Sequence, residues 1–159
     1  PLTPPPAPPP KAARLGPDKA YHLAFRALAL SQPKITSFLL DEALFTPNSS
    51  AGFHGAPIIQ VAPLSESQAV RLLEVLSLPK TYDIPYDGVP GCIGWGVGLR
   101  FEEQGRTVDV FVCLACHWVF SPEHTEPSVS LVLSESGADV LRSLLREVFP
   151  SSSTFGCRP

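Results

Sequence analysis

The chain has 159 residues, of which 44% are hydrophobic and 17% are charged, and its formal net charge is -3 at pH 7. This length and apolar content suit one folded domain and exclude a wholly disordered chain. The small negative charge, with no cluster of basic residues, argues against nucleic acid as a partner, and no apolar stretch reaches the roughly 20 residues that cross a bilayer.

The first part of the chain, residues 1–16, is rich in proline, which favours an extended polyproline II conformation. We expect an arm or tether there, a single α+β domain over residues 17–150, and a serine-rich tail over residues 151–159. Because the sequence starts at Pro1 and contains no methionine, we expect a processed, exported protein. It would be periplasmic or extracellular, with a lipid on the missing N-terminus as one form of the tether, and its partner would be a protein or the cell envelope.

The first half of the domain reads as helix, strand, strand, helix. A helix is predicted over residues 17–31 and a strand over residues 34–45, although LLDEAL within the latter also suits a helix. After a turn at residues 52–55, residues 56–64 read as an edge strand, because prolines bound it. Ser65 and Gln68 form a capping box, and leucines at helical spacing follow, which predicts a helix over residues 65–78.

The second half reads as a loop, three strands and a helix. Prolines and glycines predict the loop at residues 79–91. Strands are predicted over residues 93–102, 106–120 and 128–134, the first two joined by the three-residue loop Glu103-Gln104-Gly105. A second capping box predicts a helix that starts at Ser136 and reaches Val148.

This order predicts an α+β fold in which an antiparallel sheet contains a three-strand meander and the helices pack on one face. The strand over residues 106–120 is apolar at both odd and even positions. We therefore expect it to be central and covered on both faces.

Four cysteines are the most informative residues: Cys92, Cys113, Cys116 and Cys157. If Glu102 pairs with Arg106 across the predicted hairpin, the same register places Cys92 opposite Cys116. Facing residues on neighbouring strands lie near disulfide geometry, so a Cys92–Cys116 disulfide is predicted. Cys157, in the tail, would be without a disulfide or would reach any exposed cysteine.

Cys113, Cys116 and His117 spell the CxxCH motif that attaches c-type haem. Haem attachment needs a compact turn, whereas the flanking apolar residues favour a strand, in which residues three apart lie roughly 10 Å from each other. The strand prediction therefore disfavours haem. A second axial ligand would come from His22, His54 or His124, because there is no methionine.

Zinc and thiol redox chemistry are further alternatives for the same residues. Cys92, Cys113 and Cys116 with His54 would supply four zinc ligands. A thioredoxin-like redox pair would need its CxxC at the start of a helix, and the predicted strand argues against that as well.

Two polar residues other than the cysteines, His54 and Asp109, are candidates for a functional role. His54, in a turn, suits a base or a ligand, but a hydrogen bond to the backbone is the commoner arrangement. Asp109 lies inside an apolar strand, where a lone carboxylate would be costly, so it is predicted to meet Arg100 or Arg106, or to lie near an exposed end.

Several short motifs within residues 53–149 match one known pattern. They are Phe53-His54-Gly55, Cys92, Gly98-Leu99-Arg100, residues 105–109, and Cys113-Leu114-Ala115-Cys116. On these motifs the chain resembles small uncharacterised bacterial proteins, many of which look exported, with an F-H-G motif, a Cys-x-x-Pro-x-His-Gly-aliphatic-Arg segment and a CxxC strand. Trp95 stands in place of that proline and Val97 in place of that histidine, so the resemblance disfavours a metal site. The pattern has no histidine after its CxxC, which makes His117 incidental.

The sequence thus predicts an exported binding or structural module, stabilised by buried or disulfide-bonded cysteines, without a cofactor and without catalysis. The first alternative is a single-haem electron carrier that uses Cys113, Cys116 and His117. The second is a zinc or thiol-redox protein that uses Cys92, Cys113 and Cys116.

Overall fold

The computed structural model describes residues 25–41, 51–83, 96–122, 130–152 and 155. The strands are β1 (Lys34–Leu40), β2 (Ile58–Pro63), β3 (Tyr82–Asp83), β4 (Val97–Glu103), β5 (Arg106–Cys113), β6 (Trp118–Phe120) and β7 (Ser130–Leu133). The helices are residues 25–31, α2 (Glu66–Ser77) and α3 (Glu135–Val148), with a short 3-10 helix, η2 (Pro79–Thr81).

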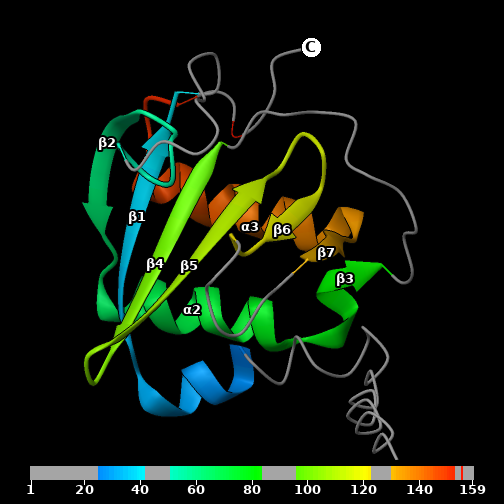
Figure 1. Ribbon diagram of the computed structural model, residues 1–159. Coiled ribbons are helices and arrows are strands. Elements are labelled where there is room, and N and C mark those ends of the chain that lie inside the picture. The colour runs from blue at the N-terminus through cyan, green and yellow to red at the C-terminus, as the bar shows by residue number, and fades with distance from the viewer. Residues whose placement is uncertain (1–24, 42–50, 84–95, 123–129, 153–154, 156–159) are drawn as a thin grey trace, which may run out of the picture.

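All seven strands belong to one sheet, in the order β2-β1-β4-β5-β6-β7-β3. Each neighbouring pair is antiparallel. Helices α2 and α3 lie behind the sheet in Figure 1, both on the same face. The predicted α+β fold, an antiparallel sheet with helices on one face, is confirmed. No helix in the described part of the chain is long and apolar enough to cross a membrane.

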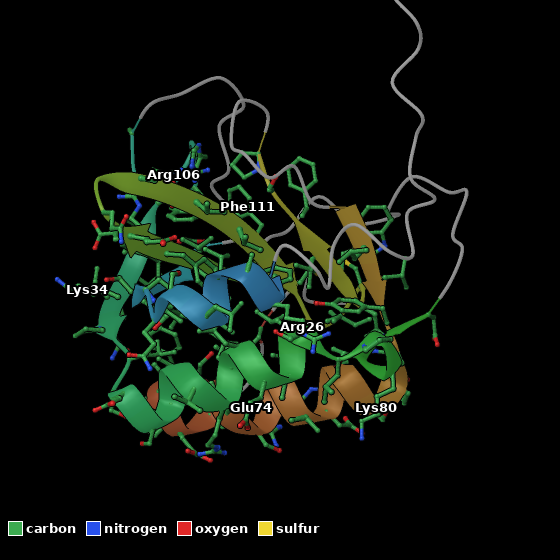
Figure 2. The ribbon with its side chains drawn as sticks, turned by 90° about the horizontal axis from the view of Figure 1, so that it is seen from below. Arg26, Lys34, Glu74, Lys80, Arg106 and Phe111 are labelled. Carbon is green, nitrogen blue, oxygen red and sulfur yellow. The ribbon has the colours of Figure 1, made fainter. Side chains whose placement is uncertain are left out.

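The sheet separates two apolar clusters. The larger one fills the space between the sheet and the helices and includes Leu76, Val110 and Leu141. The smaller one lies on the other face and consists of Phe38, Leu40, Phe53, Ala56 and Phe111. Figure 2 shows Phe111 on the side of the sheet away from α2, which carries Glu74. We call this second side the outer face.

Strand β1 settles the ambiguity at residues 34–45 in favour of a strand. It pairs with β2 on one side and with β4 on the other, and Ile35 and Phe38 are buried. Pairing on both sides decides the conformation where local propensity does not. Strand β2 pairs with β1, lies at the end of the sheet order and matches the predicted edge strand. Of the predicted helix over residues 17–31, the structure describes residues 25–31.

Helix α2 follows its prediction closely. Gln68 N donates to Ser65 Oγ at 3.3 Å, and Ser65 N donates to Gln68 Oε1 at 3.0 Å, so both halves of the capping box are present. Leu72, Leu73 and Leu76 are buried against the core, as their spacing predicts. Cap, spacing and burial all agree here, which is why the sequence is sufficient for this helix.

The start of helix α3 differs from its prediction, because the cap is Ser134 and not Ser136. Gly137 N donates to Ser134 Oγ at 3.1 Å, and Ser134 Oγ donates to Lys80 O at 2.9 Å. An added Cβ at Gly137 would lie 2.3 Å from Thr81 O. The first turn of α3 therefore packs directly on the backbone of η2, and this contact selects the earlier serine.

Replacing Ser134 with alanine is expected to lower the free energy of unfolding by about 1 kcal/mol, because the orphan amide at Gly137 loses its acceptor. Ser136→Ala, two residues later, is the matched control and should leave stability almost unchanged. Urea unfolding followed by circular dichroism measures both. A larger loss in Ser136→Ala than in Ser134→Ala would place the cap where the sequence predicts it.

The predicted loop over residues 79–91 contains regular structure at its start. Pro79 begins η2, and β3 follows at once and pairs with β7 through Tyr82 and Leu133. Proline suits the first turn of a helix, since the amide it lacks would have no helical acceptor there. Residues 84–91 lie outside the described residues.

The β4–β5 hairpin has a two-residue turn in place of the predicted three-residue loop. Glu103 pairs with Arg106, and both turn residues have positive φ, 45° at Gln104 and 80° at Gly105. Turns of this kind match the right-handed twist of the flanking strands. The predicted pairing of Glu102 with Arg106 is therefore wrong by one residue, and so is the register that placed Cys92 opposite Cys116.

The predicted strand over residues 106–120 is two strands. The chain leaves β5 at Cys113, turns through residues 114–117 and returns as β6, so that Cys113 pairs with Trp118. His117 has a φ of 56°, and Leu114 is buried in the core. An apolar turn has the same sequence pattern as a strand, which is why the break was not predicted. With the extra strand, the meander has four consecutive strands, β4 to β7.

Candidate functional site

Arg100 and Asp109 face each other across the β4–β5 pair and form a two-point ion pair. Arg100 Nε donates to Asp109 Oδ1 at 2.8 Å, and Arg100 Nη2 donates to Asp109 Oδ2 at 2.7 Å. The side chain of Asp109 is 7% exposed. These charge-assisted bonds replace the water that the carboxylate loses on burial. The predicted contact with Arg100 is confirmed, whereas Arg106 is at the hairpin turn opposite Glu103.

His54 joins this pair from a turn on the outer face. Its Nε2 lies 2.7 Å from Asp109 Oδ2. The turn is closed by hydrogen bonds between Phe53 and Ala56, and His54 has a φ of 49° in it. The predicted backbone hydrogen bond for this histidine is wrong, because the turn directs the ring at a carboxylate. We call these three residues the His54–Asp109–Arg100 cluster.

Aromatic rings surround the guanidinium of the cluster. Arg100 Cζ lies 5.6 Å from the centre of the Phe38 ring and 5.7 Å from that of Phe53, within the range of cation–π attraction. Phe53 lies directly on Gly98 of β4, where an added Cβ would be 2.6 Å from the ring. Glycine is needed at position 98 for this close approach.

The electrostatics of the cluster favour a fixed, charged arrangement. Burial alone would raise the pKa of Asp109, but hydrogen bonds from Arg100 and His54 hold it below its ordinary value. The hydrogen bond to Asp109 raises the pKa of Arg100. Both carboxylate oxygens already accept hydrogen bonds within the cluster. We therefore assign the cluster to holding the turn at residues 51–56 on the sheet.

The second candidate site is the turn that contains the CxxC motif. We call residues 113–117 the cysteine turn. Cys113 Sγ lies 2.8 Å from Cys116 Sγ, and Cys116 N donates to Cys113 Sγ at 3.3 Å. Cys113 is 1% exposed, whereas Cys116 is half-buried. The predicted separation of these sulfurs along an extended strand is wrong, because the backbone turns between them.

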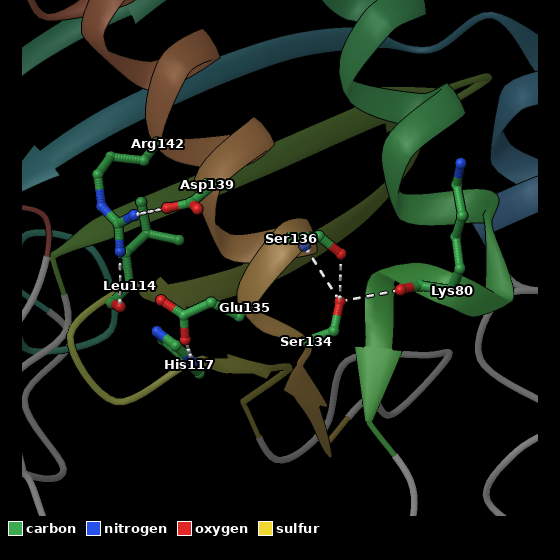
Figure 3. Close-up of polar contacts among 9 residues, drawn as sticks. Lys80, Leu114, His117, Ser134, Glu135, Ser136, Asp139 and Arg142 are labelled. Carbon is green, nitrogen blue, oxygen red and sulfur yellow. Dashed lines mark hydrogen bonds and ion pairs between the residues drawn. The ribbon is translucent and has the colours of Figure 1, made fainter.

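Three other segments fix the cysteine turn. Leu114 N donates to Phe155 O at 2.7 Å, and Leu133 N, on β7, donates to His117 O at 2.7 Å. Helix α3 contributes Arg142, whose Nη2 donates to Leu114 O at 3.5 Å, and Glu135, whose Oε2 lies 3.8 Å from His117 Nδ1 (Figure 3). The two sulfurs are thus held close together by contacts on both sides of the turn.

The two cysteines of the turn differ in oxidation state. Cys116 is disulfide-bonded, whereas Cys113 keeps its thiol. The cysteine bonded to Cys116 therefore lies outside the described residues. A thiol and a disulfide sulfur in direct contact are the reactants of thiol–disulfide exchange.

The predicted ligand sets are brought together only in part. Asp109, which holds His54, precedes Cys113 by four residues of β5, a distance of about 13 Å at the rise of a strand. Within the described residues no three metal-ligating side chains form a group that could hold a metal ion. Cys92, His22 and His124 lie outside the described residues, so the Cys92–Cys116 disulfide and the second axial ligand stay predictions. A sulfur in a disulfide cannot also carry a haem thioether, so CxxCH as it stands here does not fit covalent haem.

Sequence reasoning missed the residues that hold the cysteine turn. Arg142 and Phe155 are distant from it in sequence, and neither belongs to a motif. Gly98 belongs to one of the resemblance motifs, and its close contact with the Phe53 ring gives the physical reason for a glycine there. The positive φ of His117 left no trace in the sequence that would have marked the turn.

Comparisons with known proteins add no assignment: no family model matches the chain, and neither a curated protein nor a solved structure is significantly similar to it.

Proposed function

We propose that this protein carries out thiol–disulfide exchange at the cysteine turn, as an exported protein. The observation that supports this most is the 2.8 Å contact between Cys113 Sγ and Cys116 Sγ. The disulfide at Cys116 supports export, since structural and reactive disulfides persist in oxidising compartments. The binding or structural role predicted from the sequence stays a prediction and is compatible with this chemistry.

The exchange step needs no outside oxidant or reductant. The Cys113 thiol loses its proton, and the thiolate attacks Cys116 Sγ. A Cys113–Cys116 bond forms, the older bond at Cys116 breaks, and its electron pair leaves on the third cysteine, which takes up a proton. The number of disulfides is unchanged. The hydrogen bond from Cys116 N to Cys113 Sγ supports the step, because it stabilises negative charge on the attacking sulfur.

The two sulfurs differ in solvent exposure, and we propose different roles for them. Cys113 is buried, so thiols from other proteins reach it poorly, whereas Cys116 is half-buried and accessible from outside. A substrate dithiol would attack the Cys113–Cys116 bond at Cys116. Transfer of two electrons and two protons would leave the substrate with a disulfide and both cysteines of the turn as thiols. We propose exported proteins with cysteine pairs as the class of substrate.

Peptide mapping after acid quenching tests this function. The full chain is incubated in glutathione buffers of graded composition, alkylated under denaturing conditions and digested. A Cys113–Cys116 bond, internal to one peptide, is expected to appear at intermediate compositions. Cys113→Ser is the matched control, in which the original bond at Cys116 should persist until it is reduced. Alkylation of Cys113 at every composition, with no internal bond, would refute the proposal.

A further inference from the structure

Strand β2 forms one edge of the sheet and exposes apolar side chains. It ends the strand order, so within the described residues only β1 pairs with it (Figure 1). Ile58 is 38% exposed, Ile59 63% and Val61 51%. The strand, IIQVAP, carries no charged residue. Edge strands are commonly protected by charged side chains against pairing with another chain, and β2 lacks that protection.

The opposite edge of the sheet is different. Strand β3 forms that edge, has only two residues and ends with the exposed Asp83. A very short edge strand that carries a charge offers little backbone to a partner. Of the two described edges, β2 is therefore the one that suits pairing with a further strand.

The backbone of β2 presents hydrogen-bonding groups along its open edge. Leu64 N, directly after the strand, donates to Ile35 O on β1 at 2.9 Å, so the backbone groups of Leu64 face β1. These groups alternate between the two sides of an antiparallel strand. The amides and carbonyls of Ile59 and Val61 therefore face the open edge, where no described strand pairs with them. Pro63 faces this edge too, so the amide that it lacks is not needed by β1.

The sequence of β2 is self-complementary about Gln60. If a twofold axis passes through this residue, Ile59 of each copy lies opposite Val61 of the other, and the outward backbone groups of both residues are paired. Ile58 lies opposite Ala62, so apolar residues meet apolar residues. Gln60 lies opposite Gln60 of the second copy, and its side-chain amide holds both donors and an acceptor. Because β2 has no charge, the strands meet without like-charge repulsion, although the chain has a net charge of -3.

We infer that β2 is the interface of a homodimer, in which the β2 strands of two copies pair antiparallel in a register centred on Gln60. The partner is an extended strand, because only an extended backbone supplies donors and acceptors that match an open sheet edge. The two sheets then form one continuous sheet. This interface does not depend on the exchange proposed for the cysteine turn, which lies between β5 and β6.

Light scattering of the full chain at graded concentrations tests the dimer. We expect the mass to rise from monomer to dimer, with no disulfide between the copies on a non-reducing denaturing gel. Val61→Lys should raise the dissociation constant roughly tenfold or more, because the twofold axis introduces the charge twice. Val70→Lys on α2 and Val140→Lys on α3 are matched controls, since these valines are 48% and 49% exposed.

Three results would overturn the inference. They are a monomer at every concentration, a dimer joined only by a disulfide, and equal weakening in Val61→Lys and the two controls. Should Val61→Lys fail to fold, hydrogen exchange of the wild-type protein gives the same decision. The amides of Ile59 and Val61 should exchange several-fold more slowly in the dimer than in the monomer, and exchange that is independent of concentration would contradict the pairing.

A charge swap at Gln60 tests the register. Gln60 is exposed, so Gln60→Glu and Gln60→Lys should both fold, and each should weaken its own dimer by placing like charges on facing residues. An equimolar mixture should restore dimers, because glutamate then lies opposite lysine. If the mixture stays as weak as the separate variants, the register is wrong. Neither variant should alter reshuffling at the cysteine turn, so this inference and the proposed function fail separately.

Discussion

Replacing Phe53 with alanine is expected to lower the free energy of unfolding by about 3 to 4 kcal/mol, the cost of removing a buried aromatic ring. Phe53 is 1% exposed, and its ring centre lies 4.9 Å from that of Phe38 and 5.0 Å from that of Phe111. The ring also holds His54 in position for Asp109. Loss of the Phe53 ring therefore removes apolar packing and also loosens the His54–Asp109–Arg100 cluster.

Chemical denaturation monitored by tryptophan fluorescence measures this change. Leu30→Ala is the control, because Leu30 is 84% exposed and should cost little. Gly98→Ala is a second variant that fills the space under the same ring, and overpacking there should cost about 1 to 3 kcal/mol. If Phe53→Ala were as stable as Leu30→Ala, the turn at residues 51–56 would not be held on the outer face as described.

Asp109→Ala should lower the free energy of unfolding by about 3 kcal/mol, because it leaves Arg100 without its buried partner. We take the low end of the range for buried pairs, since Arg100 is 38% exposed and water can still reach it. The matched control is Glu147→Ala, which breaks the two-point pair with Arg71 at an exposed site and should change stability little. Equal losses in the two variants would contradict the role of the cluster.

The contribution of Asp109 should depend on pH. Its pKa is lower in the folded protein than the value of about 3.9 in an unfolded chain, so the folded state favours the ionised form. The stabilisation is therefore complete above about pH 5 and is lost as pH falls through the folded pKa. Stability curves of wild type and Asp109→Asn should converge below about pH 4. A gap that widened on acidification would show that the carboxylate is not the stabilising species.

The sequence predicts a feature of this fold well when the residues that determine it are close together in the chain. Helix α2 is fixed by its own capping box and its own leucines, so it was predicted within a residue or two. The contact of Arg100 with Asp109 was also predicted, because a carboxylate in an apolar strand needs a cation, and Arg100 and Arg106 are the cations near it in the predicted hairpin. Its second partner, His54, is 55 residues away, and only the folded turn reveals it.

The cysteine turn shows where local reasoning fails. Residues 106–120 have the composition of one long strand, and neither glycine nor proline interrupts them. The break after Cys113 depends on His117 in a left-handed conformation and on contacts from Phe155, Leu133 and Arg142. All three come from later in the chain. The sequence therefore predicted separated sulfurs where tertiary contacts bring them together.

The most direct test of the central claim is carbon-13 NMR of cysteine-labelled protein in glutathione buffers, since the cysteine Cβ shift distinguishes thiol from disulfide. At intermediate compositions we expect Cys113 to become oxidised while Cys116 stays oxidised, because the disulfide moves to the Cys113–Cys116 pair. If Cys113 stays a thiol until Cys116 itself is reduced, the two sulfurs are neighbours that do not exchange, and the proposed function is wrong.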